Sequence, residues 1–455
     1  MTEQSLQYAH ASQLTTAPGR SALELATSGG SWSAASTASP VFFDGFVEHA
    51  DAVATAMLVV GRVARTRFYV PPNMLAAVLR AADPVVTSTP EGLRLESFSP
   101  CAGVYARLDL DASALDTSIV TSGVTNVDFN PEMRGLLASV AGGEPMRLTV
   151  GSADFTVSTL DDTVTEKKVP LPERWLRSFA EAQVVARQSS LRIELGSAEA
   201  RRFVADLPRS SSTKSVMWAS PSTRGVRLAS RPAVGAACIA GPERLRVLEP
   251  VLRFSTGLRG YDAGEGHAAA SFWQVDLPMG RLVIGLSPEK ARGFSGEGQL
   301  LDDLLETSAD DDADVLSARI AFDPRIEPES LATELGLPEE RVRTALAALA
   351  SQGQLGYDLQ TSRYFHRPLP YARDLLQSLH PRLAGARSLV DAGAVTLGVD
   401  ATAVVSSKGA SYTVRLSTPD RTGETCTCAW YGKYRGTRGA CKHVLAARMV
   451  SGLTA

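Results

Sequence analysis

Three cysteines and one histidine near the end of the sequence have the types and the spacing of a metal site. They run in the order Cys-x-Cys, twelve residues, Cys-x-His, and are Cys426, Cys428, Cys441 and His443. Three thiolates and one imidazole are a standard ligand set for a structural zinc ion, which takes four ligands in a tetrahedron. Because protein ligands fill all four positions, no place remains for water or substrate. The pattern therefore predicts one structural Zn²⁺ and no catalytic residue here.

The alternative interpretation is that these are incidental cysteines and a surface histidine. Three of the five cysteines of the chain and one of its six histidines fall between residues 426 and 443, in ligand order. This clustering favours the metal site.

The flanking residues indicate which elements must hold these ligands. Cys426 and Cys428 follow a strand-like run, SYTVRLS, and residues two apart in a strand or tight turn can face one ion. The run CKHVLAARM is typical of the start of a helix. Residues two apart on a regular helix lie about 200° apart, so Cys441 should precede the helix and His443 should lie in its first turn. A helix N-terminus also stabilises a thiolate. These features predict a ββα unit in which the metal joins a hairpin to a helix.

Basic and aromatic side chains surround the predicted ligands and have two interpretations. They could form a nucleic-acid surface, in which cations neutralise phosphates and aromatic rings stack on bases. Alternatively, the aromatic rings shield the thiolates from water and the cations are simply solvated. Both interpretations remain open for a set consisting of Trp430, Lys433, Tyr434, Arg435, Arg438 and Lys442.

The rest of the chain divides by composition and pattern into several parts. We expect a flexible leader over 1–40, an N-terminal α+β domain over 41–160, a second α+β subdomain over 161–296, an acidic stretch with a winged-helix-like domain over 297–370, and the zinc-finger domain over 371–455. Apolar residues at helical spacing after residue 50 predict a helix, and the runs GLRLESF, GVYARLDL, PMRLTVG and DFTVSTL predict strands. The expected fold class is multidomain α+β, with a mixed α/β N-terminal region, a winged-helix-like segment and a C-terminal ββα finger.

The winged-helix expectation rests on a short helix over 329–335, a longer helix that opens at Pro338, and a hairpin formed by QLGYD and RYFHR. A helix that reads DNA usually presents basic or amide side chains near its N-terminus. Here Glu339 and Glu340 stand beside Arg341 and Arg343, after a stretch rich in acids. The acidic residues would be repelled by a duplex, which favours a protein contact.

The cysteine–histidine motif resembles the SWIM-type zinc finger. The match covers roughly residues 387–449, and CTCAWYGKYRGTRGACKHVLAA is its specific part. The runs FFDGFVEHADAVATAMLVVGRVARTRFYVP and GVTNVDFNPEMRGLLASV look like those of long actinobacterial SWIM-finger proteins. Members of that group tend to be encoded beside a MoxR-type AAA+ ATPase and a von Willebrand A-type protein. The resemblance implies a zinc module that contacts DNA or protein, and it does not imply catalysis.

Composition and missing motifs narrow the function classes further. The chain carries a net charge of −3, which excludes a globally basic nucleic-acid coat. It has no apolar run of the roughly 18–20 residues that a membrane helix needs, no signal-peptide pattern and no P-loop. We therefore expect a cytoplasmic, non-enzymatic adaptor with a protein partner and no membrane contact. The alternative is a DNA-binding protein that uses finger and wing together, and a third option is an enzyme with an unrecognised site in 41–296.

Overall fold

The computed structural model describes most of the chain and divides it into two compact units. The described residues are 13–17, 20–24, 40–65, 84–169, 171, 173–210, 216–223, 225–264, 268–288, 293–294, 310–351, 353–367, 369, 381–418, 423–436 and 439–452. The units are Met1–Pro40 and Val41–Ala455. In the first, β1 (Gln13–Ala17) pairs with β2 (Arg20–Glu24) as an antiparallel hairpin. All other elements belong to the second unit.

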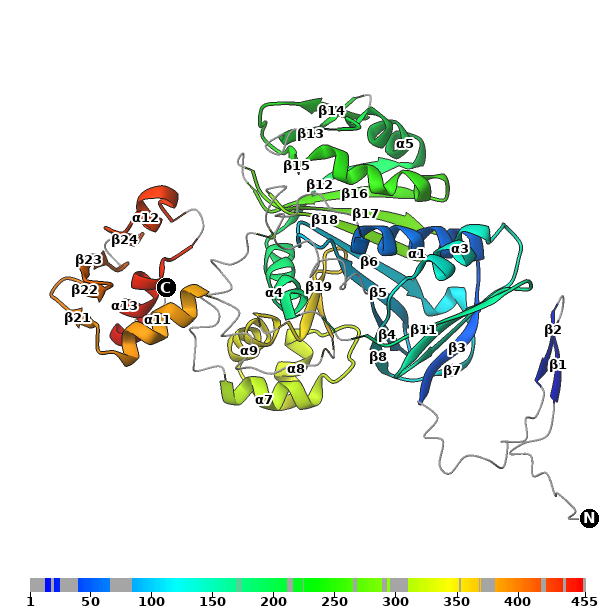
Figure 1. Cartoon of the computed structure of the whole chain (residues 1–455), viewed down its shortest axis with the longest axis horizontal. Helices are drawn as coiled ribbons and strands as arrows, with labels where there is room; N and C mark the ends of the chain where they lie inside the picture. The colour runs from blue at the N-terminus through cyan, green and yellow to red at the C-terminus, as the bar shows by residue number, and fades with distance from the viewer. Residues whose placement is uncertain are drawn as a thin grey trace, which may run out of the picture. The chain divides into compact units, whose positions relative to one another are not determined.

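An eight-stranded antiparallel sheet is the largest element of the second unit (Figure 1). Its strands, in spatial order, are β12 (Ser190–Gly196), β16 (Gly257–Asp262), β17 (Ser271–Leu277), β18 (Gly280–Leu286), β6 (Val104–Asp111), β5 (Gly92–Phe98), β4 (Val85–Thr89) and β8 (Gly123–Asn126). Gly92 and Gly280 begin strands that flank β6, with φ of 139° and 140°. A Cβ on either would lie within about 2 Å of a carbonyl oxygen of β6, so both positions require glycine.

Two smaller sheets complete this part of the chain. One has five strands in the order β11 (Thr163–Lys167), β10 (Asp154–Ser158), β9 (Met146–Gly151), β3 (Val41–Val47) and β7 (Leu115–Val120). The other has three strands in the order β14 (Gly225–Ala229), β13 (Val216–Ser222) and β15 (Ala237–Ala240). Their helices are α3 (Pro131–Ser139), α5 (Ser197–Asp206) and the 3₁₀ helix η3 (Pro242–Arg253), with a short 3₁₀ turn, η2 (Ala112–Ala114).

The two faces of the large sheet differ in chemistry because side chains alternate along each strand. On one face Leu95 and Leu108 pack with Val53 and Met57 of helix α1 (Ala50–Arg65), which lies against β5 and β6 (Figure 1). The opposite face of β5 and β6 is charged and aromatic. Helix α4 (Glu173–Arg187) covers the aromatic part of that face, where Phe179 packs edge-on against Phe98 at 4.9 Å between ring centroids.

A hairpin contacts the charged part of the same face, and three helices pack with this hairpin. They are α7 (Asp310–Arg319), α8 (Pro328–Leu335), α9 (Glu339–Ser351), β19 (Leu355–Asp358) and β20 (Arg363–His366). These elements have a core of their own, which includes Leu316, Val342 and Leu346. Just after β20, Arg367 reaches the large sheet and forms a buried ion pair with Glu96 of β5 at 2.8 Å. We refer to residues 310–369 as the helix–hairpin segment.

The last described part of the chain combines a small sheet with three helices. The sheet order is β21 (Val395–Leu397), β22 (Thr402–Ser407), β23 (Ala410–Arg415) and β24 (Thr425–Cys426). The helices are α11 (Pro381–Asp391), α12 (Ala429–Tyr434) and α13 (Lys442–Ser451). Leu383 and Ala386 of α11 pack against Leu445 and Ala446 of α13.

The predicted fold class is wrong. The strands form several antiparallel sheets rather than a mixed α/β region, because tight turns such as that between β4 and β5 leave no room for the crossover helix of a parallel pair. The molecule therefore does not have the predicted arrangement of a mixed N-terminal region, a winged-helix-like segment and a C-terminal ββα finger. At the C-terminal end four strands and three helices replace ββα, since α11 is needed to cover the apolar side of α13. Within the part of the chain that the structure describes, no helix combines the length and apolar character needed to cross a membrane.

Candidate metal centre

Three elements bring the predicted metal ligands together. Cys426 ends β24, where it pairs with Val414 of β23. Cys428 is the N-cap of α12 and accepts a hydrogen bond from the backbone N–H of Tyr431 at 3.4 Å. Cys441 is the N-cap of α13, with extended backbone, and His443 is the second residue of that helix. The expected position of Cys441 before a helix and of His443 in its first turn is confirmed.

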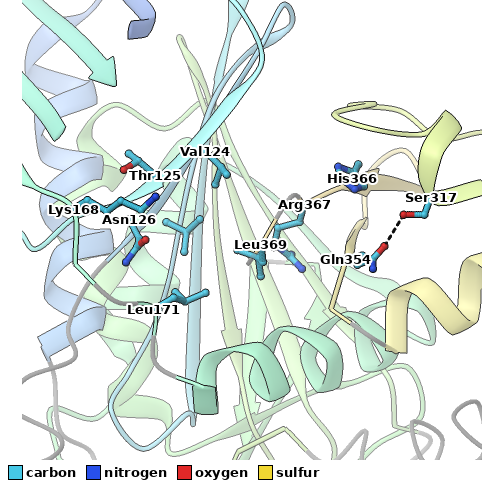
Figure 2. Close-up of a pocket in the computed structure, with 11 residues that line it drawn as sticks. Val124, Thr125, Asn126, Lys168, Leu171, Ser317, Gln354, His366, Arg367 and Leu369 are labelled. Carbon is cyan, nitrogen blue, oxygen red and sulfur yellow. Dashed lines mark hydrogen bonds between the residues drawn. The ribbon is translucent and has the colours of Figure 1, made fainter. Parts of the chain in front are cut away.

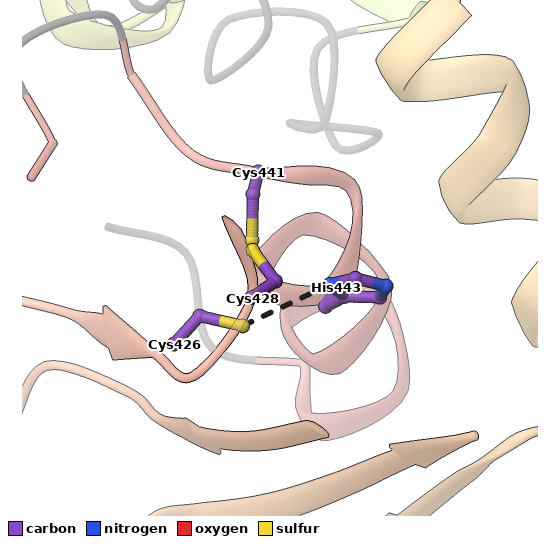
Figure 3. Close-up of side chains that lie close together, drawn as sticks. All are labelled: Cys426, Cys428, Cys441 and His443. Atoms are coloured by element: carbon purple, nitrogen blue, oxygen red, sulfur yellow. Dashed lines mark hydrogen bonds between the residues drawn. The ribbon is translucent and has the colours of Figure 1, made fainter. Parts of the chain in front are cut away.

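The four side chains point toward a common centre (Figure 3). Their ligand atoms all lie within 4.8 Å of one another. The Cys426 Sγ and His443 Nδ1 atoms are 3.8 Å apart. All four residues are buried, none more than 6% exposed. These residues could hold a metal ion, and their donor set of three sulfurs and one imidazole nitrogen is the set that zinc accepts in closed structural sites.

The electrostatics of the site favour an ionised thiol at Cys441. The hydrogen bond from the Cys426 thiol, with those from His443 and the backbone N–H of Val444, lowers the pKa of Cys441 to about 4. Hydrogen bonding to Cys441, together with burial, raises the pKa of Cys426. Burial raises the pKa of Cys428. In the protein without an ion, one thiolate therefore suppresses the ionisation of its neighbours, and a bound cation would relieve their repulsion.

The residues around the ligands form a small core. Its buried members other than the three cysteines are Ala403, Val405, Val414, Leu416, Val444 and Ala447. The ring of Tyr412 stacks on His443 at 4.2 Å between centroids, with 18° between the planes. Sequence reasoning missed Tyr412, although it stands two residues before Val414 in the strand expected to precede the cysteines. It also missed the ion pair of Glu424 with Arg448 at 2.7 Å.

The basic and aromatic residues named from sequence do not share one surface role. Trp430 packs against Tyr434 at 4.5 Å, and the guanidinium of Arg382 lies 4.7 Å from the Trp430 ring. Lys433 and Arg435 are exposed, and the Lys433 ammonium lies 5.0 Å from the Tyr434 ring.

Two further residues of that set are placed differently. The Lys442 Nζ donates a hydrogen bond to Ser407 Oγ of β22 at 3.0 Å. Arg438 lies outside the described residues. The rings of Trp430 and Tyr434 in α12 thus contact other side chains of the protein.

Comparisons with known proteins give no family assignment. No protein-family model matches the sequence, and no curated protein matches it. Among solved structures, the PCNA2–PCNA3 complex from Sulfolobus tokodaii matches at a TM-score of 0.39 and 10% identity, over 55% of this chain and 100% of that chain. Proliferating cellular nuclear antigen from Entamoeba histolytica matches at a TM-score of 0.35 and 9% identity, over 54% of this chain and 98% of that chain.

Proposed function

We propose that the protein is a non-enzymatic adaptor whose C-terminal region is folded around one structural zinc ion. The observation that carries this proposal is the buried group of Cys426, Cys428, Cys441 and His443, with ligand atoms within 4.8 Å of one another. A site closed by four protein ligands has no open position for substrate or water, which is the property that separates structural from catalytic zinc.

The small size of the surrounding core supports a structural role for the ion. Three of the nine buried residues in that core are the cysteines themselves. The predicted ligands come from β24, from the start of α12 and from the start of α13. A bound ion would therefore connect three elements that have few apolar contacts with one another. Domains of this kind commonly depend on a metal for their folding.

The resemblance to SWIM-type fingers and the surface of α12 support a protein partner. Because Trp430 and Tyr434 pack against each other and under a cation, their rings are poorly placed to receive stacked bases. We propose that this surface contacts a protein. The gene neighbourhood of similar SWIM proteins suggests a MoxR-type AAA+ ATPase or a von Willebrand A-type protein, and copurification with the native chain tests that choice.

The structural role of zinc is tested by comparing Cys428→Ser with Cys101→Ser in the full-length chain. Cys101 lies in a turn far along the sequence from the site, so its substitution is a matched control. We expect Cys428→Ser to lose bound zinc and to expose residues 381–452 to limited proteolysis, while residues 41–294 stay protected. Cys101→Ser should behave like the native protein. Unchanged protease resistance of Cys428→Ser would contradict the proposal.

Nucleic-acid binding is the second candidate function, favoured by the exposed cations Lys433 and Arg435 beside Tyr434. It is tested by titrating a fluorescent single-stranded oligonucleotide at increasing salt. A DNA-binding protein would show a linear fall of log affinity with log salt, and Arg435→Glu would weaken binding more than Arg415→Glu, an exposed arginine of β23. The adaptor proposal predicts no binding at low salt for any of the three proteins.

A further inference from the structure

A cavity of about 430 Å³ lies between the β8 end of the large sheet and the helix–hairpin segment (Figure 2). One wall carries Val124, Thr125 and Lys168, and the opposite wall carries His366 and Gln354. The size is within the usual range of roughly 300–1,000 Å³ for sites that bind small molecules. The residues that line this cavity are remote in sequence from the four residues of the candidate metal centre and include none of them.

The lining combines four apolar residues with seven polar ones, and its charged residues are basic. The apolar part consists of Val85, Val124, Leu171 and Leu369, and none of the eleven lining residues is an acid. Arg367 also lines the cavity, but its guanidinium donates to both carboxylate oxygens of Glu96, at 2.8 and 2.9 Å. The charge of Arg367 is therefore neutralised inside the protein.

Lys168 supplies the remaining charge of the lining. Among the described residues it forms no ion pair, whereas its neighbour Lys167 pairs with Asp154 at 3.4 Å. The ammonium of Lys168 is thus available to an anion from outside the chain.

The opposite wall adds hydrogen-bond donors without adding charge. The Nδ1 atom of His366 accepts a hydrogen bond from the backbone N–H of Phe322 at 3.0 Å, which places the ring proton on Nε2. Burial, with the positive charge of Arg367, lowers the pKa of His366 to about 4, so the ring is neutral near pH 7. Gln354 Oε1 accepts from Ser317 Oγ at 3.2 Å, which leaves the amide N–H groups of Gln354 as donors.

We propose that this cavity binds a small carboxylic acid with an apolar chain. The carboxylate would pair with Lys168, and the chain would lie along Val124, Leu171 and Leu369. With a single free cation in the described lining, charge complementarity favours a monocarboxylate over a phosphate ester or a dicarboxylate. One wall comes from β4, β8 and residues that follow β11, and the other comes from the helix–hairpin segment, so the bound acid would also stabilise the docking of that segment.

The test uses octanoate as the probe and 1-octanol as its uncharged counterpart, measured by isothermal titration calorimetry on the full-length zinc-loaded protein. Lys168→Met removes the charge, and Lys167→Met makes the same change at an adjacent position. We expect saturable binding of octanoate, weakened about tenfold by Lys168→Met and less than about twofold by Lys167→Met, since a hydrogen bond to a charged group is lost only in the first variant.

The affinity for 1-octanol should be the same in the native protein and in Lys168→Met. The proposal is overturned if octanoate does not bind saturably, or if the two lysine variants weaken it equally. It is also overturned if Lys168→Met weakens octanoate and 1-octanol to the same extent. Lys168 is exposed, so its substitution should not disturb folding.

Discussion

At the scale of single residues, two cysteines of the candidate metal centre lie at the N-termini of helices. Cys428 and Cys441 both occupy N-cap positions, where backbone N–H groups and the helix dipole favour negative charge. Both positions precede the regular turns of their helices, so each sulfur can turn toward the common centre of the four side chains. His443 is held from one side by the stacked ring of Tyr412.

The stack on His443 gives a prediction about zinc affinity. Groups that orient a ligand typically change metal affinity by 10–100-fold when they are removed. Because Tyr412 fixes the plane of the His443 ring, Tyr412→Ala should weaken zinc binding by about tenfold in competition with a chromogenic chelator. Tyr434→Ala removes a ring from α12 that does not contact His443 in the described contacts, and it should change zinc affinity by less than about threefold. Equal affinities of Tyr412→Ala and native protein would contradict this role.

At the scale of elements, charged residues on the face of β5 and β6 and on neighbouring β18 form ion pairs with residues of the helix–hairpin segment. Asp109 accepts from Arg94 at 2.6 Å and from Arg281 at 3.0 Å, and Arg281 also pairs with Asp358 of β19 at 2.5 Å. Burial alone would raise the pKa of Glu96, but the charge of Arg367 and its hydrogen bonds lower it overall. The segment is therefore attached through buried charges as well as through apolar contacts.

Removing one partner of the buried pair should release this attachment. Arg367→Met leaves Glu96 buried without its cation, which typically costs about 3–5 kcal/mol. Arg363→Met breaks the exposed pair with Glu327 at 2.8 Å and should cost less than about 1 kcal/mol. Denaturant unfolding, with hydrogen exchange to locate the change in residues 310–369, measures both effects. Similar losses in the two variants would show that the buried pair has no special role.

The neutral His366 makes the docked segment sensitive to acid. The folded-state pKa of about 4 lies below the usual value of 6.5, so the unfolded chain binds the proton more readily. The stability from this group is fully present above pH 6.5 and is lost as pH falls toward 4. Between pH 7.5 and pH 5, native protein should lose about 2 kcal/mol more than His366→Gln. Parallel pH profiles for the two proteins would contradict a depressed pKa.

Local patterns in the sequence predicted elements better than they predicted architecture. The alternation in GLRLESF and the helical spacing of Val53, Met57 and Val60 correspond to strand β5 and helix α1. The pairing of strands was not predictable, because strands such as β6 and β18 are far apart in the sequence. Nothing in the residues of either strand indicates which strand it pairs with. Tyr412 and α12 were missed because a stacked ring and a six-residue helix leave almost no periodic signal.

At the scale of the whole molecule, the cores separate along the sequence. The two cores of the last described region contain no residue before Leu383. The cores that include the large sheet and the helix–hairpin segment contain no residue after Leu369. Unfolding of one region should therefore leave the core of the other intact, which is what the zinc proposal requires.

The metal content of the purified full-length chain is the most direct test of the zinc proposal. Elemental mass spectrometry on the native protein should find one equivalent of zinc per chain. The same measurement on Cys428→Ser should find clearly less than one equivalent, because the loss of one thiolate ligand weakens the binding of the ion. Native protein purified without chelators that carried no zinc, or Cys428→Ser that retained a full equivalent, would contradict the assignment of these four residues as a closed structural site.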